Sequence, residues 1–242
     1  MFKYLLFTLF LFLSAVYYSF NFTPTDSHTL FLSISTFLFA TFSGFFIARQ
    51  GRRYNAIRNQ IAVFDGMMSS LYRNFEYFGS KHTDSIKKII KAHYTKIIKN
   101  KAWDYHFVNK SSTIIDINKL NRAIDRNKAS IAEAAVIREN LRIARDLQIA
   151  RKKMVVLYQE RIPHFQWFLI AFLAFILLLT VSLIPSQAQL TSSILKGAFG
   201  TCVILVIVLL RQFETLHFFE DVVGEHSAHD ILGILLGKKY LI

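Results

Sequence analysis

The chain has 242 residues, of which 53% are hydrophobic and only 19% are charged, and its mean hydropathy is +0.34. A soluble domain usually carries about 25% charged residues, so this composition indicates helices in lipid. The few glycines and prolines argue against a disordered chain and an all-β sandwich, and a single cysteine excludes an intrachain disulfide.

The formal net charge of +13 is concentrated in the middle of the chain. Residues 49–163 contain 24 Lys and Arg but only 10 Asp and Glu, whereas the two flanking parts together are almost neutral. Lysine and arginine collect in the cytosolic segments of membrane proteins. The charge distribution therefore predicts a cytosolic insert between two membrane hairpins.

The N-terminal part, residues 1–48, predicts the first transmembrane hairpin. Its apolar run Leu5–Phe20 is expected to be a span, and a signal peptide is the alternative because Lys3 precedes the run. The second run, Leu30–Ala48, has about 19 residues, which suffice to cross about 30 Å of hydrocarbon. The loop between the runs contains no Lys or Arg, so we expect it outside the cytosol.

Residues 49–163 predict a basic helical cytosolic domain. The second span is expected to continue as a helix to about Gly79, and residues 84–103 have the apolar spacing of another helix. From Asn118 to Arg161 there is no Gly or Pro, which predicts one long helix. Its apolar stripe needs a partner from this chain or another subunit, and consists of Ile137, Leu141, Ala144, Leu147, Met154 and Leu157.

Residues 164–211 predict the second transmembrane hairpin. Its spans are Trp167–Ile184 and Ile194–Leu210, and Lys196 is expected to extend toward the lipid headgroups. The prediction is an all-α membrane protein with four transmembrane helices per subunit and a large helical cytosolic insert between spans two and three. By the positive-inside rule, both termini are expected in the cytosol.

Residues 212–242 predict a cytosolic amphipathic segment with a weak candidate metal site. His217 and Asp221 are one helical turn apart, as are His226 and Asp230. Imidazole and carboxylate groups bind divalent cations, but a solvated helix face explains the same pattern and is favoured. No other cofactor is expected. The sequence contains no catalytic motif that we recognise, so we expect no enzyme.

The second span has an aromatic cytosolic half that includes Phe39, Phe42, Phe45 and Phe46. These side chains either face lipid or a neighbouring helix, or form apolar rings that gate a pore by dewetting. The pore interpretation requires an oligomer in which this span lies nearest the axis.

A set of arginines follows the second span and recurs on one face of the long helix. It could form a positive cytosolic vestibule that concentrates anions, or it could orient the chain and bind anionic headgroups. No nucleic-acid recognition motif accompanies these arginines, so nucleic acid is not expected. The candidate vestibule residues are Arg49, Arg52, Arg53, Arg138, Arg142 and Arg145.

Four stretches carry a resemblance to a known family. They are GFFIARQGRRYNAIRNQIAVFDGMMSSLYR (44–73), Trp103 at the end of KIIKNKAW, RIPHFQW (161–167) and LLRQFETLHFFEDVVGE (209–225). The chain resembles the bestrophin channels and the bacterial bestrophin-like membrane proteins. The resemblance implies a pentamer whose second spans line a pore with an apolar neck, here at Thr41, Phe42, Phe45 and Phe46.

The expected function is therefore passive conduction by an oligomeric channel of the bacterial inner membrane, in which anions are slightly favoured. Its partners would be the lipid bilayer, small inorganic ions and further copies of the chain, as a homo-pentamer. The long acidic run of calcium-gated bestrophins is missing, so calcium gating is not expected. The alternative is a non-conducting membrane-anchored scaffold or sensor that acts through its cytosolic helices.

Overall fold

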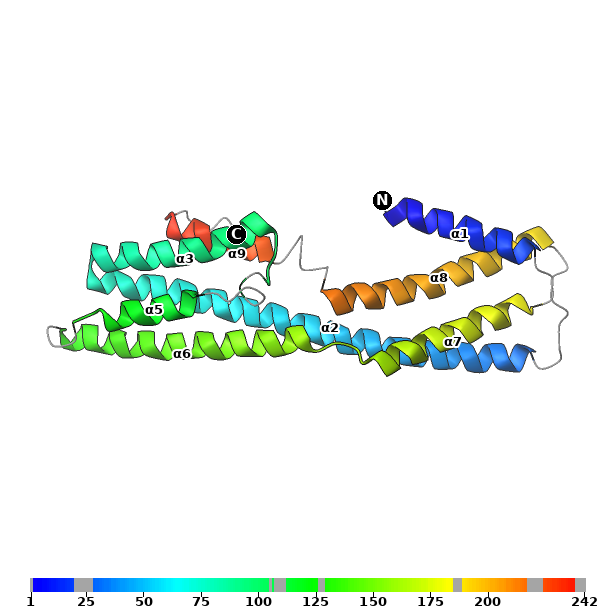
Figure 1. The fold of residues 1–242 in the computed structure, drawn as a ribbon, viewed down its shortest axis with the longest axis horizontal. Coiled ribbons are helices and arrows are strands. Elements are labelled where there is room, and N and C mark those ends of the chain that lie inside the picture. The colour runs from blue at the N-terminus through cyan, green and yellow to red at the C-terminus, as the bar shows by residue number, and fades with distance from the viewer. Residues whose placement is uncertain are drawn as a thin grey trace. The chain divides into compact units, whose positions relative to one another are not determined.

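The computed structural model describes residues 2–19, 28–104, 106, 112–125, 129–184, 189–216 and 224–237. Within these segments every regular element is helical, as Figure 1 shows, so the prediction of an all-α chain is confirmed there. The elements are α1 (Phe2–Ser19), α2 (His28–Phe75), the 3-10 turn η1 (Glu76–Phe78), α3 (Ser80–Asn100), α5 (Thr113–Arg122), α6 (Ile131–Gln159), α7 (His164–Ser182), α8 (Gln189–Thr215) and α9 (Gly224–Leu235).

The chain divides into two compact units. The first unit comprises residues 1–52 and 161–215, and the second comprises residues 53–160 and 216–242. Helix α2 contributes its N-terminal half to the first unit and its C-terminal half to the second.

Three helices of the described chain are long and apolar enough to cross a membrane. They are α2, α7 and α8, and the apolar part found in α1 is the shorter stretch Phe7–Ser19. The described residues therefore contain three candidate membrane spans.

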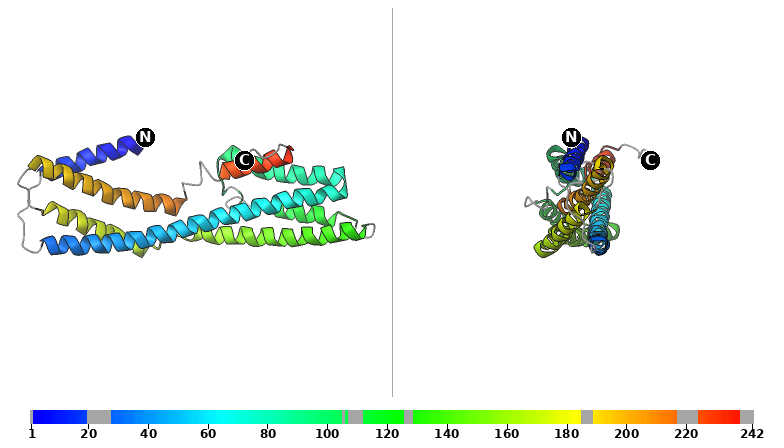
Figure 2. Two further views of the ribbon diagram at one scale, coloured as in Figure 1. Left: turned by 180° about the vertical axis from the view of Figure 1, so that it is seen from behind. Right: turned by 90° about the vertical axis from the view of Figure 1, so that its right-hand side faces the viewer.

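Helices α1 and α8 of the first unit lie side by side in both views of Figure 2. Gly197 makes this approach possible, since a Cβ atom there would lie 2.1 Å from Ser14 Oγ and 3.0 Å from Ser14 Cα. Nearby, the Tyr17 hydroxyl donates a hydrogen bond of 3.2 Å to the carbonyl oxygen of Leu178 in α7. Small residues of this kind let membrane helices pack closely.

The N-terminal half of α2 packs against α7 and α8 through an apolar cluster. It includes Phe39 and Phe46 of α2, Leu173 and Leu177 of α7, and Leu210 of α8. Ser35 of α2 lies 3.4 Å from Thr180 of α7, oxygen to oxygen, which adds a buried polar contact. The three candidate spans therefore share one core.

The second unit has the larger core, formed by the C-terminal half of α2 with α3, α5, α6 and α9. Its side chains include Met68, Leu71, Ile86 and Leu147, none of which is exposed to solvent. The predicted stripe of the long helix thus finds its partner within the chain. Ile137, Ala144, Leu147 and Met154 are buried, whereas Leu141 is exposed.

The single helix predicted from Asn118 to Arg161 is wrong. Helix α5 ends at Arg122, and α6 begins at Ile131. The start of α6 is a capping box in which the Glu133 amide donates to Ser130 Oγ and the Ser130 amide donates to Glu133 Oε2. This motif satisfies the first amides of a helix, so it sets a helix start without Gly or Pro.

The predicted end of the second helix near Gly79 is confirmed. Helix α2 ends at Phe75, and Gly79 adopts a positive φ of 83° between η1 and α3. A side chain would strain this conformation. The Thr83 hydroxyl, which donates to the carbonyl oxygens of Phe75 and Gly79, ties the turn to the start of α3.

Candidate functional site

The four predicted neck residues divide between two faces of α2. Phe46 is 3% exposed and Phe42 half-buried, and both contact the apolar cluster with α7 and α8. Thr41 and Phe45 lie on the outward face, where Phe45 is 56% exposed. The Phe45 and Phe46 rings meet edge to face, with centroids 5.5 Å apart.

The outward faces of α2 and α7 differ in composition. On α7 this face is almost entirely large and apolar, with Phe165, Phe168, Phe172, Phe175 and Leu179. On the predicted second span it carries large side chains in the first half, at Leu30, Phe31, Ile34 and Phe37, and is mostly small in the cytosolic half, with Ala40, Thr41, Gly44, Phe45 and Ala48. A Cβ atom at Gly44 would meet no atom within 4 Å. Surfaces of small residues favour close approach of another helix or a narrow passage.

The six predicted vestibule arginines have different surroundings. Arg53 is buried and donates from Nε to the Leu157 carbonyl (2.6 Å) and from Nη2 to the Tyr158 carbonyl (2.8 Å), so it closes the C-terminal end of α6. Arg142 and Arg145 are exposed on α6 and form ion pairs with the carboxylates of Glu139 and Asp146. Arg52 and Arg138 are exposed, and Arg49 is half-buried.

The predicted metal site is only partly described by the structure. His217 and Asp221 lie outside the described residues. His226 and Asp230 are both exposed on α9. No group of three or more His, Cys, Asp or Glu that could hold a metal ion occurs among the residues that the structure describes.

Two charged side chains of α8 form hydrogen bonds with other groups of the first unit. Lys196 Nζ donates to the Ile184 carbonyl at 2.7 Å, just past the C-terminal end of α7. Glu214, 5% exposed, accepts from the Ile162 amide (3.2 Å), the Trp167 indole (3.1 Å) and the Arg211 guanidinium (2.9 Å). Glu214 thereby joins the end of α8 to the segment that enters α7.

A polar cluster that was not predicted lies inside the second unit, centred on Asp65. This carboxylate of α2 is 7% exposed and accepts one hydrogen bond from the Tyr94 hydroxyl of α3 and another from the Ser227 hydroxyl of α9. Buried carboxylates are costly unless such donors satisfy them. Asp65 therefore connects three helices of the second unit.

A stacked pair of histidines lies beside this cluster. The rings of His93 and His106 are parallel within 9°, with centroids 3.6 Å apart. His106 Nε2 donates to the His93 carbonyl at 2.8 Å, and His93 Nδ1 lies 3.0 Å from the Thr113 hydroxyl at the start of α5. Burial is the main reason that both pKa values fall below the ordinary 6.5, and the positive charge of Lys96 lowers both further. Both rings are therefore neutral at pH 7.

The histidines and Asp65 border a partly open cavity of about 40 Å³. Its walls are mainly apolar and include Phe64, Trp103 and Met154. Arg151 of α6 also lines the cavity, and its Nε is buried without a hydrogen-bond partner among the described residues. The cavity thus combines apolar walls, a neutral imidazole pair and one guanidinium donor.

The sequence contains a partial signal for this cluster. Asp65 and His93 interrupt apolar stripes at positions where the helical period expects a core residue, between Phe64 and Met68 in α2 and between Ile90 and Ile97 in α3. A polar residue in such a stripe indicates a buried polar contact. The partners Ser227 and Arg151 are too distant in sequence for spacing to identify them.

The comparison with family models decides what kind of chain this is. The model of the bestrophin-like domain matches residues 6–215. The chain belongs to the bestrophin-like family. No curated protein and no solved structure matches the chain significantly.

The bestrophin-like domain includes the three candidate spans and nearly all of the polar cluster. It ends at the last residue of α8, so α9 lies beyond the matched residues. Ser227, one of the two donors to Asp65, thus comes from outside the bestrophin-like domain. Family membership agrees with the candidate spans in identifying a membrane protein of a channel-like family.

Proposed function

We propose that the chain is one subunit of an oligomeric ion channel that conducts passively in the bacterial inner membrane. The subunit crosses the membrane four times, since α1 joins the three candidate spans, and both termini lie in the cytosol. Copies of the chain form a homo-pentamer, and the N-terminal half of α2 lines the axis. The bestrophin-like domain supports the channel class of this proposal.

The observation that carries the proposal is the contrast between the outward face of α7 and that of residues 40–48 in α2. Lipid chains are matched by large apolar side chains such as those of α7. The small residues and Thr41 on α2 suit a surface that meets other subunits around an axis. On this face the Phe45 side chains of all subunits together form the apolar ring around the pore. Phe46 instead stabilises each subunit, because it packs in the apolar cluster with α7 and α8.

A slight preference for anions follows from charge. Arg49 and Arg52 follow the apolar ring at the cytosolic end of the span, and residues 49–163 carry a large positive excess. Positive charge at a pore mouth raises the local concentration of anions. Arg53, Arg142 and Arg145 contribute less, because the first binds backbone carbonyls and the others are paired with carboxylates.

The test is to record currents from the purified protein in planar bilayers. Phe45→Ala should change the unitary conductance or open probability, because it removes the phenyl groups that form the apolar ring around the pore. Phe172→Ala is the matched control, since Phe172 is also a phenylalanine about half exposed (49%), but on α7. This control should leave the current unchanged.

Silence of the wild-type protein across voltage, pH and calcium concentration would refute conduction. The remaining interpretation would then be a membrane-anchored scaffold or sensor. A current that responds equally to both substitutions would refute the assignment of α2 to the axis. Counting the subunits of the detergent-solubilised particle by electron microscopy tests the pentamer separately.

A further inference from the structure

The cavity beside the stacked histidines has no role in conduction as proposed above. We propose that it is a binding site for one small monovalent anion, a halide or a short carboxylate such as formate. Arg151 holds this anion between α6 and the imidazoles of His93 and His106. The inference concerns the second unit and does not depend on whether the chain conducts.

Size limits the occupant. One water needs about 10–15 Å³ of such space, and an apolar cavity that binds benzene has about 150 Å³. The cavity of about 40 Å³ therefore accepts a few atoms and excludes an aromatic ring or a nucleotide. A halide ion or formate fits this limit.

The unpaired donor defines the chemistry of the occupant. Arg151 Nε is buried and donates to no described residue, and a buried donor left unpaired costs about 1–3 kcal/mol. An occupant that accepts this hydrogen bond removes the cost. An anion does so more strongly than water, because charge-assisted hydrogen bonds are roughly twice as strong as neutral ones.

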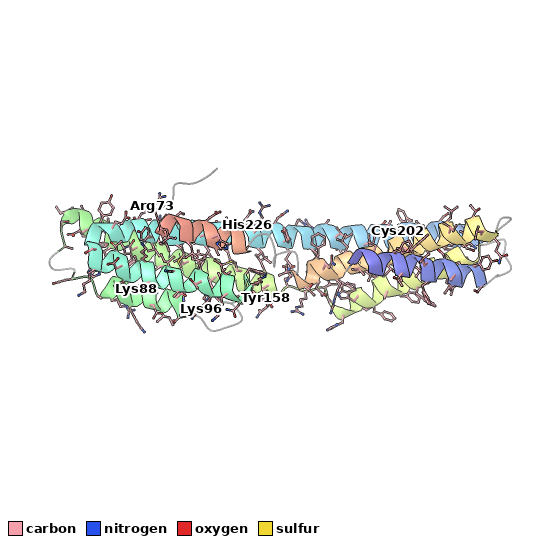
Figure 3. All side chains as sticks on the ribbon, turned by 90° about the horizontal axis from the view of Figure 1, so that it is seen from above. Arg73, Lys88, Lys96, Tyr158, Cys202 and His226 are labelled. Atoms are coloured by element: carbon pink, nitrogen blue, oxygen red, sulfur yellow. The ribbon has the colours of Figure 1, made fainter. Side chains whose placement is uncertain are left out.

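The charges around the cavity favour an anion. Arg151 of α6 and Lys96 of α3 are positive, and both lower the pKa of His106 by repulsion, after the larger effect of burial. Figure 3 labels Lys96 on α3. Asp65 is the acidic group in the wall; burial raises its pKa, and its two oxygens already accept from Tyr94 and Ser227. Asp116 of α5 and Asp230 of α9 are exposed or half-exposed, so solvent screens their charges.

Proton uptake should accompany anion binding. His106 donates through Nε2 to a backbone carbonyl, so in the neutral ring Nδ1 carries no proton. An anion in the cavity offsets the repulsion from Arg151 and Lys96 and so raises the pKa of the imidazole pair. The affinity should therefore increase as the pH falls from 7.5 to 6.

Trp103 provides a probe because its indole lines the same cavity. Bromide, a fluorescence quencher of suitable size, is titrated into the full-length protein in detergent at constant ionic strength, with gluconate as the balancing anion. Quenching should contain a saturable component that is absent from Trp103→Phe. Chloride and formate are added as competitors, and the better competitor distinguishes a halide site from a carboxylate site.

Arg151→Gln should raise the half-saturating bromide concentration at least about tenfold, which is the usual loss for one charge-assisted hydrogen bond. Arg138→Gln is the matched control, since Arg138 is an exposed arginine on the same helix, and it should bind bromide as the wild type does. If Arg151→Gln loses helical circular dichroism, Arg151→Lys is measured instead. Lysine keeps the charge but not the Nε donor and should weaken binding less.

Three results would overturn the proposal. The first is quenching that rises linearly with bromide, because collision alone then explains it. The second is a saturable component that persists in Trp103→Phe, or that neither Arg151 variant weakens. The third is equal weakening by Arg138→Gln, because the site would then be general surface attraction. None of these results involves a measurement of current. Failure of the proposed conduction and failure of the proposed anion binding can therefore be distinguished.

Discussion

Glu214 provides the sharpest test of how the first unit is held together. Its carboxylate is 5% exposed and accepts hydrogen bonds from the Ile162 amide, the Trp167 indole and the Arg211 guanidinium. The Arg211 guanidinium also lies 5.9 Å from the centre of the Trp167 ring. Substitution by alanine removes the common acceptor and leaves two donors without it, the buried Ile162 amide and the partly buried Trp167 indole.

The expected cost follows from these two donors. A buried donor that loses its acceptor costs about 1–3 kcal/mol and a partly buried one costs less, whereas the Arg211 bond adds little because its side chain is 66% exposed. Glu214→Ala should therefore lower the free energy of unfolding by about 3 kcal/mol, which for a chain of this length is a fall of about 6–12 °C in Tm. Glu214→Gln keeps a carbonyl acceptor and should lose about half as much.

The assay is unfolding of the detergent-solubilised protein, followed by circular dichroism and by tryptophan emission. Glu139→Ala is the matched control, because Glu139 also pairs with an arginine three residues away, but on the exposed surface of α6. It should shift the midpoint far less. If Glu214→Ala and Glu139→Ala behaved alike, the reasoning from the buried acceptor would be refuted.

Three further predictions concern the second unit. Leu147→Ala, which empties a fully buried position, should cost about 3 kcal/mol in denaturant unfolding, and much more than Leu141→Ala at the exposed side of the same helix. Arg53→Lys removes the pair of hydrogen bonds to the Leu157 and Tyr158 carbonyls and should lower the free energy of unfolding by about 2 kcal/mol in the same measurement. An unchanged midpoint would show that these hydrogen bonds are not needed for stability. Because His93 and His106 have lowered pKa values, their contribution to stability is complete above pH 6.5 and is lost as the pH falls below it. The denaturation midpoint should therefore drop between pH 7 and 5.5 in the wild type and drop less in His106→Gln, and equal drops would contradict the assignment.

The helical class and the core of the second unit could be predicted because water separates polar from apolar faces there, whereas the family was indicated by the resemblance of four stretches of the sequence. In α6 the residues Ile137, Ala144, Leu147 and Met154 recur with the helical period, and all four are buried. The break before Ile131 was missed because a capping box consists of ordinary residues and is visible only when Ser130 and Glu133 are considered together.

The faces of the spans could not be predicted in the same way. Lipid and protein interior are both apolar, so nothing in the sequence distinguishes the buried Phe46 from the exposed Phe45. The cluster around Asp65 depends on residues from three helices. Its partner Ser227 is 162 positions away along the chain, and helical spacing carries no information over that separation.

The contact between Asp65 and Ser227 has a practical consequence for expression. The bestrophin-like match ends at residue 215, which makes it a natural place to truncate the gene. A protein shortened there would lack a hydroxyl donor to a buried carboxylate and would uncover the core surface now protected by Ala228, Ile231 and Leu235. Truncated material should precipitate or be degraded during purification, and a version that retains the last helix should not.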